Sequence, residues 1–328
     1  MVGRYKIEIY DSRVHYELDI KRNITILQGD SGIGKSVLVG LVREYANNPD
    51  SSGITLKCDK PCYELTELTW RYFTQNYHNC IFFIDEEHNF FRTKEFADVV
   101  KRSDAYYIII CREPLKELAY SVNEIYTLGS ESNKYPQSKQ VYSTQQEILN
   151  FSTLNYKIDL IITEDTNSGY DFYKNAISIP CVSAGGKSNI ENIMRQNCGK
   201  SILVVADGAA FGCEVQKCVD HAKGRNIAFF LPESFEWVIL KSGIFDIPNQ
   251  VINETWSYAE TTKYFSWERF YTYYLSDITQ NNQGQYSKRR LSPFYLTEGN
   301  KAKIRAILPA FVYNGPAPSI DLFDKIGG

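Results

Sequence analysis

The hydrophobic pattern at the start of the chain predicts strands first and a helix after them. Residues 5–10 and 13–20 alternate between apolar and polar positions on either side of an Asp-Ser pair, which predicts an antiparallel hairpin. A third apolar run, 24–27, leads through a glycine-rich loop into a helical pattern over 37–45. Two later runs of large apolar residues, 80–84 and 105–111, are typical of parallel strands buried on both faces.

The second half of the chain alternates short apolar runs with helical patterns four times, which predicts βαβ units and a parallel sheet. The expected strands are 158–163, 178–182, 201–206 and 227–231, and the expected helices are 168–176, 189–196, 213–222 and 234–241. We therefore expect an α/β protein with a first domain over 1–128, a polar linker over 129–155, a second domain over 156–245, and an aromatic, mainly helical cap and tail over 246–328.

Composition agrees with two globular domains and adds little about partners. The chain has 328 residues, 43% hydrophobic and 23% charged, with a net charge of −3, so any polyanion site must be local. Eight cysteines and four histidines lack the spacing of a zinc site. No leader segment and no membrane-length apolar stretch are evident, and free thiols suit a reducing compartment, so we expect a cytoplasmic protein without a membrane partner.

The glycine-rich loop carries the strongest chemical signal. It matches G-x-x-x-x-G-K-S between a strand and a helix, and its residues are Gly29, Asp30, Ser31, Gly32, Ile33, Gly34, Lys35 and Ser36. The glycines allow successive backbone N–H groups to surround a phosphate. Lys35 would contact the β- and γ-phosphates, and the Ser36 hydroxyl would ligate Mg²⁺. The alternative is a glycine-rich turn that binds nothing.

Acidic residues follow the apolar run 80–84, where a nucleotide site needs them. Asp85 would hold Mg²⁺ through water, and Glu86 would act as the general base that activates a water for attack on the γ-phosphate. Arg112 follows the next strand and is either a γ-phosphate sensor or an ordinary surface arginine. The chain lacks the N-K-x-D motif that reads guanine, so ATP is favoured over GTP. These features predict a compact P-loop NTPase domain.

Two acids end expected strands of the second domain, Glu164 after the first and Asp207 after the third. Carboxylates at the carboxyl edge of a parallel sheet predict an Mg²⁺ site completed by substrate phosphate. The alternative is that both are helix N-terminal charges that favour the helix dipole.

These residues carry a resemblance to a known fold. Glu164, the aromatic segment 169–173, Gly-Gly-Lys at 185–187 and Asp207-Gly208 together resemble the Toprim fold of topoisomerases, primases and the overcoming-lysogenization-defect nucleases. A P-loop ATPase joined to a Toprim-like domain also resembles anti-phage defence systems, including the PARIS pair. The resemblance implies a metal-dependent nuclease. Ala209 stands where Toprim enzymes have a second Asp, and the acids that would replace it are Glu214, Glu233 or Glu236.

The last 80 residues combine aromatic side chains with a basic stretch. Its positive side chains are Lys288, Arg289, Arg290, Lys301, Lys303 and Arg305. This combination is typical of single-stranded DNA or tRNA binding, but a packed helical cap with solvated charges explains it more simply.

Two functions fit the sequence as a whole. One is an ATPase whose nucleotide state gates a Mg²⁺-dependent nuclease, and the other is a nucleotide-dependent switch whose inactive Toprim-like domain binds a protein partner. A small-molecule kinase would leave the second domain unexplained. A homo-oligomer is expected by analogy with other compact P-loop domains, which often complete their site with a neighbour's arginine.

Overall fold

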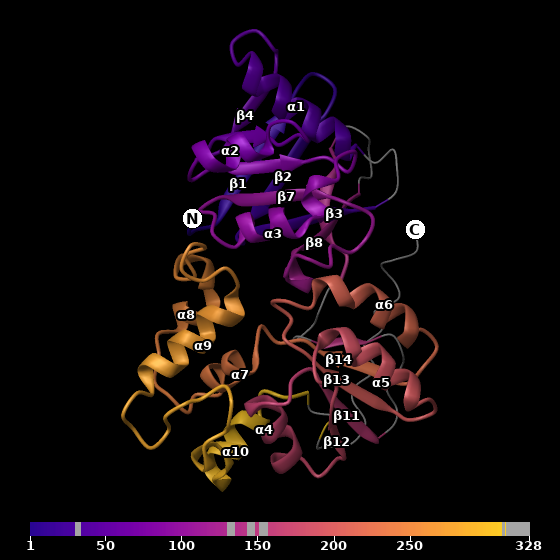
Figure 1. The fold of residues 1–328 in the computed structure, drawn as a ribbon, viewed down its shortest axis with the longest axis vertical. Helices are drawn as coiled ribbons and strands as arrows, with labels where there is room; N and C mark the ends of the chain where they lie inside the picture. Colours follow the sequence, from indigo (N-terminus) through magenta and orange to yellow (C-terminus); the bar gives the residue numbers. More distant parts are fainter. Residues whose placement is uncertain (30–33, 130–134, 143–147, 151–156, 310–311, 313–328) are drawn as a thin grey trace. The chain divides into compact units, whose positions relative to one another are not determined.

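The computed structural model describes residues 1–29, 34–129, 135–142, 148–150, 157–309 and 312. The chain forms two compact units (Figure 1). The first contains Met1–Tyr142 and Asn253–Ser266, and the second contains Ser143–Ile252 and Trp267–Gly328. Both are α/β units, each built around its own sheet.

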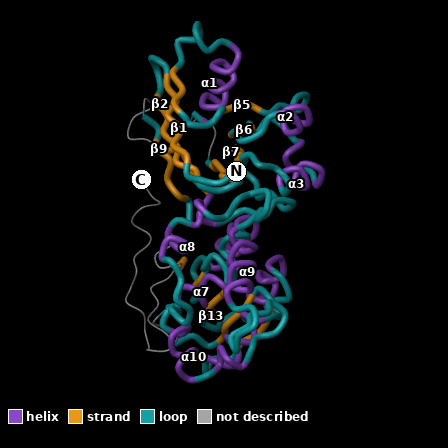
Figure 2. The backbone as a smooth tube through the Cα atoms, turned by 90° about the vertical axis from the view of Figure 1, so that its left-hand side faces the viewer, coloured by secondary structure: helices purple, strands orange, loops and turns teal. Residues whose placement is uncertain are grey.

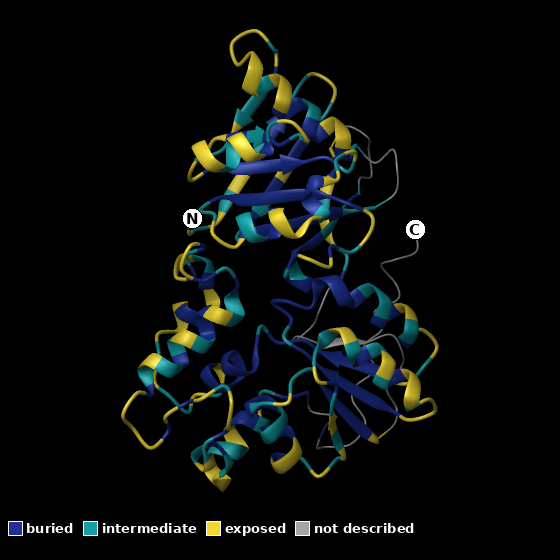
Figure 3. Cartoon of the chain, viewed as in Figure 1, coloured by how far each residue is buried: buried dark blue, intermediate teal, exposed yellow. Residues whose placement is uncertain are grey.

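The first unit holds a nine-stranded mixed sheet in the order β4-β1-β2-β9-β8-β3-β7-β6-β5. Its strands are β1 (Tyr5–Tyr10), β2 (His15–Ile20), β3 (Ile24–Gln28), β4 (Thr55–Lys57), β5 (Cys62–Glu64), β6 (Ile81–Ile84), β7 (Tyr106–Ile110), β8 (Ile125–Gly129) and β9 (Gln137–Gln140). The predicted hairpin is confirmed as the antiparallel pair β1–β2. The predicted buried strands are confirmed as β6 and β7, which pair in parallel and whose side chains are fully buried (Figure 3).

Among the residues that the structure describes, three helices and three short 3₁₀ segments belong to the first unit. The helices are α1 (Lys35–Asn47), α2 (Trp70–Asn76) and α3 (Lys94–Val100), with short 3₁₀ segments at Phe90–Arg92, Val122–Glu124 and Thr255–Ser257. Helix α1 packs against β1, β5 and β6 (Figure 2). It buries Leu38, Leu41 and Val42, whose 3–4 spacing places them on one helix face.

The second unit is built around a five-stranded sheet in the order β10-β14-β13-β11-β12. Its strands are β10 (Ile148–Asn150), β11 (Leu160–Thr163), β12 (Cys181–Ser183), β13 (Ile202–Val205) and β14 (Ile227–Phe230). Its helices include α4 (Ser168–Ala176), α5 (Ile190–Gln196), α6 (Gly212–Ala222) and α7 (Phe235–Lys241), with a 3₁₀ turn at Lys187–Asn189. The four predicted strand–helix repeats are therefore confirmed, and β11–β14 pair in parallel as expected.

The C-terminal region is mainly helical, as predicted. It contains α8 (Asn249–Asn253), α9 (Trp267–Ile278), a 3₁₀ turn at Pro293–Leu296 and α10 (Glu298–Arg305). Helix α9 packs against α7 and buries Phe270, Tyr271 and Leu275. Within the described residues, no helix has both the length and the apolar character needed to cross a membrane.

The boundaries differ from the predicted ones in two places. Strands β9 and β10 lie inside the range expected to be a linker. The side chains of β9 are polar and mostly exposed, so no apolar run marks this strand. Residues 253–266, expected in the C-terminal cap, belong to the first unit. The Gly3 N–H donates to the Trp256 carbonyl (2.7 Å), and the N-terminal ammonium donates to Thr261 Oγ1 (2.6 Å). The start of the chain thus holds this segment in place.

Candidate functional sites

The two ends of the glycine-rich loop meet at the start of α1. Gly29 follows β3 with φ 127°, and Gly34 caps α1 with φ 86°, conformations that glycine adopts without strain. Lys35 and Ser36 occupy the first turn of α1. The Lys35 ammonium is buried and donates to the Gly29 carbonyl (2.7 Å), so it ties one end of the loop to the other. The four intervening motif residues, Asp30, Ser31, Gly32 and Ile33, lie outside the described part of the chain.

Ser36 and Asp85 come together although 49 residues separate them. The Ser36 hydroxyl donates to Asp85 Oδ1 (3.3 Å), and the Glu86 N–H donates to the same oxygen (2.6 Å). The Asp85 side chain is buried at the carboxyl end of β6. A hydroxyl and a carboxylate in contact are hard oxygen ligands of the kind that Mg²⁺ prefers, so these two residues fit an Mg²⁺ site.

Glu86 and Arg112 form a bidentate ion pair just beyond the carboxyl ends of the neighbouring strands β6 and β7. Arg112 Nη2 donates to Glu86 Oε1 (2.7 Å) and Nε donates to Oε2 (3.0 Å). The hydrogen bonds from Arg112 hold the pKa of Glu86 below its usual value, and the charge of Lys35 acts in the same direction. Glu86 is therefore a carboxylate at neutral pH, as a general base must be.

A third group of ligand-type side chains lies beside Asp85 and was not predicted. Ligand atoms of Glu64, Glu87 and His88 lie within 4.8 Å of one another. Burial raises the pKa of Glu64, and Arg43 approaches its Oε1 at 3.4 Å. The sequence carried only a weak signal for this cluster, because Glu64 ends the three-residue strand β5, which no apolar run announces.

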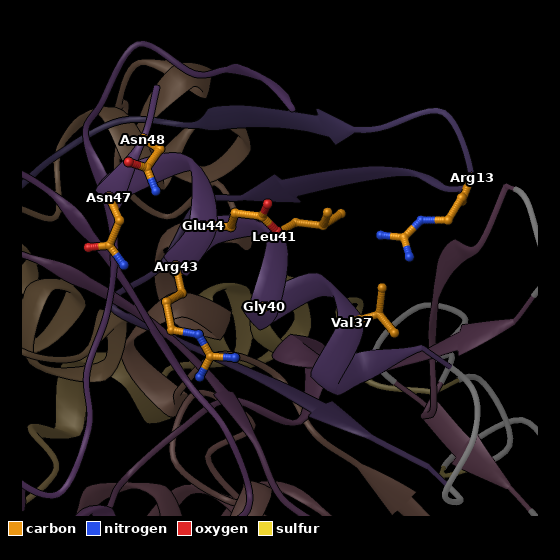
Figure 4. A pocket seen from close by; sticks show the side chains of 8 residues that line it. All are labelled: Arg13, Val37, Gly40, Leu41, Arg43, Glu44, Asn47 and Asn48. Atoms are coloured by element: carbon orange, nitrogen blue, oxygen red, sulfur yellow. The ribbon is translucent and has the colours of Figure 1, made fainter. Parts of the chain in front are cut away.

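A hollow of about 470 Å³ runs along the outer side of α1 (Figure 4). Arg13 of the β1–β2 turn and Val37 lie at its one end, and Asn47 and Asn48 lie at the other. Neither Lys35 nor Asp85 lines it. The hollow is thus separate from these two residues.

In the second unit, Glu164 and Asp207 follow the adjacent parallel strands β11 and β13. The Asp207 N–H donates to Glu164 Oε2 (3.1 Å), and both residues are partly buried. The chain turns after Asp207, whose carbonyl accepts a hydrogen bond from the Ala210 N–H (3.0 Å), and the Gly208 N–H in this turn donates to the Pro232 carbonyl (2.6 Å). A Cβ on Gly208 would lie 2.5 Å from the Leu231 carbonyl oxygen, so the turn requires glycine.

The acids of this site repel one another in a poorly solvated place. Burial raises the pKa of Glu164 to about 7, and the negative charges of Glu268 and Asp165 act in the same direction. Burial and the charges of Glu268 and Glu164 raise the pKa of Asp207 well above its usual value. Clustered carboxylates with raised pKa values favour a bound cation, which would relieve their repulsion.

Two residues of this cluster, Glu268 and Lys288, come from the C-terminal region, and the sequence did not predict their place beside the acids. Glu268 opens α9, and its Oε1 accepts a hydrogen bond from Lys288 Nζ (2.5 Å). Burial by itself would lower the pKa of the Lys288 ammonium. The negative charges of Glu236, Asp207 and Glu268 outweigh this effect and raise the pKa. Lys288 therefore supplies positive charge to the acidic site. Its place in a basic stretch had suggested nucleic-acid contact.

Of the three acids that could replace the missing second Asp, Glu236 is the one whose charge affects the pKa of Asp207. It is almost fully buried, accepts a hydrogen bond from the Tyr286 hydroxyl (2.8 Å), and raises the pKa of Asp207 through its charge. Glu214 instead forms an ion pair with Lys217 on its own helix. Glu233 contributes its carbonyl, which accepts from the Ala209 N–H (3.3 Å).

The described acids do not form a closed metal cage. Glu164, Asp207 and a third Asp, Glu, His or Cys ligand do not lie mutually within 4.8 Å in the described part of the chain. A cavity of about 20 Å³, enough for one water, lies beside Glu164, Asp165 and Asp207. The buried Tyr173 also lines it, and its hydroxyl has no hydrogen-bond partner among the described residues. Two carboxylates with room for water fit Mg²⁺, which keeps much of its water shell.

Gly185, Gly186 and Lys187 form the turn before α5, beside the acidic residues. The Gly186 N–H donates to the Glu164 carbonyl (2.7 Å), and Lys187 Nζ donates to the Ala210 carbonyl (2.7 Å). The charge of Lys187 lowers the pKa of Glu164, against the larger effect of burial. The turn thus brings a second ammonium to the site.

Most of the basic C-terminal stretch has partners inside the second unit. Lys288 faces the acids, Lys301 pairs with Glu298 (2.6 Å), and Lys303 donates to the Gly243 carbonyl (3.4 Å). Arg289 and Arg290 are exposed. The arrangement agrees with the simpler prediction of a packed helical cap.

No protein-family model, curated protein or solved structure matches this chain. The two candidate sites offer different chemical groups. The first offers a lysine, a hydroxyl and a carboxylate around a glycine-rich loop, as phosphate and Mg²⁺ binding require. The second offers buried acids and ammonium groups, which suit metal-assisted work on a phosphate ester.

Proposed function

We propose that the first unit is a P-loop NTPase domain that binds and hydrolyses ATP, and that its nucleotide state gates a Toprim-like, Mg²⁺-dependent nuclease in the second unit. The observation that carries the proposal is the contact of Ser36 with Asp85 at 3.3 Å, next to Lys35 on the first turn of α1. A glycine-rich loop with no nucleotide function gives no reason for this juxtaposition.

Under this proposal, each candidate residue of the first unit has a role in ATP binding or hydrolysis. Lys35 would leave the Gly29 carbonyl and bind the β- and γ-phosphates, since both are acceptors for the same ammonium. Ser36 and Asp85 would hold Mg²⁺, which when bound neutralises charge on the phosphates. Glu86 would accept the proton of the attacking water, and Arg112 would keep Glu86 ionised and oriented until nucleotide binds.

The second unit supports a reaction on nucleic acid through its acids and its ammonium groups. Glu164 and Asp207 would hold Mg²⁺, which when bound polarises a phosphodiester and relieves the repulsion between the two acids. Glu268 and Glu236 add negative charge around Asp207, and Lys288 would stabilise charge on the phosphate. A DNA or tRNA substrate and a role in anti-phage defence follow from the resemblance to Toprim-like effectors.

One observation favours the alternative, a nucleotide-dependent switch with an inactive second unit that binds a protein partner. Ala209 is buried and uses its N–H to hold the Glu233 carbonyl, so this turn offers no second acid. The Lys288 ammonium also already balances part of the negative charge.

The two functions are separated by a cleavage assay on the full chain with single-stranded DNA, duplex DNA and tRNA, with Mg²⁺ or Mn²⁺ and with or without ATP. The nuclease proposal predicts ATP-dependent cleavage that is lost in both Lys35→Ala and Asp207→Ala. ATP binding without cleavage of any substrate supports the switch. Cleavage that persists in Asp207→Ala would contradict our assignment of the site.

A further inference from the structure

The Tyr16 side chain contacts the glycine-rich loop from a strand that the motif does not include. Tyr16 lies on β2, is buried among the core residues of the first unit, and donates its hydroxyl to the Gly34 carbonyl (2.8 Å). No sequence motif links these positions, which lie 18 residues apart. The contact joins the antiparallel part of the sheet to the start of α1.

The Tyr16 hydroxyl can approach this closely because residue 34 is a glycine without a Cβ. Its φ of 86° is left-handed, and a Cβ at this position would lie 2.6 Å from the Tyr16 hydroxyl oxygen. The Gly34 carbonyl also accepts the first hydrogen bond of α1, from the Leu38 N–H (3.0 Å). Two donors on one oxygen hold the peptide group between Gly34 and Lys35 in one orientation.

The orientation of this peptide group matters for anion binding. Because the peptide bond is planar and trans, a fixed Gly34 carbonyl fixes the Lys35 N–H in the opposite direction. The carbonyl points along α1 toward Leu38, so the N–H points outward from the helix N-terminus. Outward N–H groups at this place are the donors that a P-loop offers to a β-phosphate.

We propose that Tyr16 is a positioning residue of the nucleotide site, which holds the Gly34–Lys35 peptide ready for the β-phosphate of a nucleoside di- or triphosphate. The inference rests on the proposed function. Without the hydroxyl, the peptide group would gain freedom that phosphate binding must then remove, so affinity falls although Tyr16 never touches the nucleotide. Burial raises the pKa of Tyr16 to about 12, so the hydroxyl keeps its proton at neutral pH.

The test compares Tyr16→Phe with a matched variant, Tyr106→Phe. Tyr106 is equally buried in the same unit, and its hydroxyl donates to the Gly3 carbonyl (2.9 Å). Each variant loses one buried hydroxyl-to-carbonyl hydrogen bond, so both should lose similar thermal stability. Only Tyr16→Phe should weaken the binding of MgADP and MgATP, by about fivefold, the equivalent of one hydrogen bond. Adenosine, which has no phosphate, should bind both variants and the wild type equally.

A second pair of variants covers the case in which Tyr16→Phe does not fold. Gly34→Ala adds a methyl group against the Tyr16 hydroxyl, whereas Gly53→Ala adds one at a left-handed glycine (φ 69°) with open space around it. Both carry backbone strain, but only Gly34→Ala should weaken MgADP binding. The positioning role would be overturned if wild type and Tyr16→Phe bound MgADP with equal affinity. It would also be overturned if the two members of a pair lost MgADP affinity equally. A wild-type chain that binds no MgADP or MgATP would instead contradict the proposed function itself.

Discussion

Arg112 holds both carboxylate oxygens of Glu86, at 2.7 and 3.0 Å, across the neighbouring strands β6 and β7. The pair joins two residues to which the sequence suggested separate roles, a general base and a phosphate sensor. Under the proposed function, a bound nucleotide would offer Arg112 a competing anion. The pair would then couple the proposed base to the γ-phosphate.

Replacement of Arg112 by alanine should change the pH dependence of ATP hydrolysis. Arg112 lowers the pKa of Glu86, so Glu86 in Arg112→Ala takes up a proton at a higher pH than in the wild type. The acidic limb of the kcat/KM profile, which reports the free enzyme, should shift upward in pH. Steady-state rates from pH 4.5 to 8 measure this shift. Lys101→Ala, which removes an exposed cation paired with Asp98, is the control and should leave the profile unchanged. An unshifted profile in Arg112→Ala would show that Glu86 is not the titrating base.

Neutralising Asp207 should stabilise the second unit at high pH. Glu164 has a pKa of about 7 in the folded chain against a usual value of 4.5, and the pKa of Asp207 is raised as well. Between the unfolded and folded values the native state holds protons that the unfolded state has lost, so stability falls as pH rises through this window. Asp207→Asn removes one of the repelling charges.

The expected gain for Asp207→Asn is on the order of 2 kcal/mol at pH 8 and much less at pH 5. Thermal unfolding at both pH values measures it. Mg²⁺ should stabilise the wild type at pH 8 and have little effect on the variant. Equal stability of wild type and variant at pH 8 would contradict the account of a crowded carboxylate site.

Glu268 should contribute to cation binding although it lies outside the β-sheet. It is the largest named charge effect on both Glu164 and Asp207. Glu268→Gln should weaken Mn²⁺ binding to the second unit by roughly tenfold, a typical effect of losing a supporting carboxylate. Titration calorimetry with Mn²⁺ in the Asp85→Asn background keeps the proposed metal ligand of the first unit out of the measurement.

Glu298→Gln is the matched control for Glu268→Gln. Glu298 forms a similar pair with a lysine, Lys301, but on the exposed surface of α10. It should leave Mn²⁺ affinity unchanged. If the two variants bind Mn²⁺ equally well, Glu268 does not belong to the site.

A methyl group on Gly208 should unfold the turn that presents Asp207. The added Cβ would lie 2.5 Å from the Leu231 carbonyl oxygen, and backbone atoms cannot move aside cheaply. We expect Gly208→Ala to cost about 2–4 kcal/mol in the free energy of unfolding. Gly299→Ala, in α10 with open space around it, should instead stabilise slightly, because alanine favours helix. Denaturant unfolding of both variants checks the difference, and equal stabilities would be incompatible with the described turn.

The strand–helix repeats of the second unit were predictable because their signal is local. Runs such as 202–205 are apolar over four consecutive residues, and each is followed by a helical pattern. Asp207 could likewise be placed at a strand end. Strand β9 could not be found, since its side chains are polar although it lies between β2 and β8 in the sheet. Its pairing depends on a neighbour that only the fold supplies.

The parts of the two sites that depend on long-range contacts could not be predicted from the sequence. Glu268 and Lys288 reach the acids because α9 packs on α7, and no spacing in the sequence encodes that contact. The Tyr16 hydroxyl and the Gly34 carbonyl meet for the same kind of reason. The glycine-rich motif could be predicted because its residues are consecutive in sequence.

The most direct test of the central claim is ATP binding and turnover by the full chain, with Lys35→Ala and Asp85→Asn beside the wild type and Lys101→Ala as the control. We predict that the wild type and Lys101→Ala bind MgATP and release phosphate. Lys35→Ala should lose binding, and Asp85→Asn should lose turnover and its response to Mg²⁺. A wild-type chain that neither binds nor hydrolyses ATP, or one whose activity survives Lys35→Ala, would contradict the account.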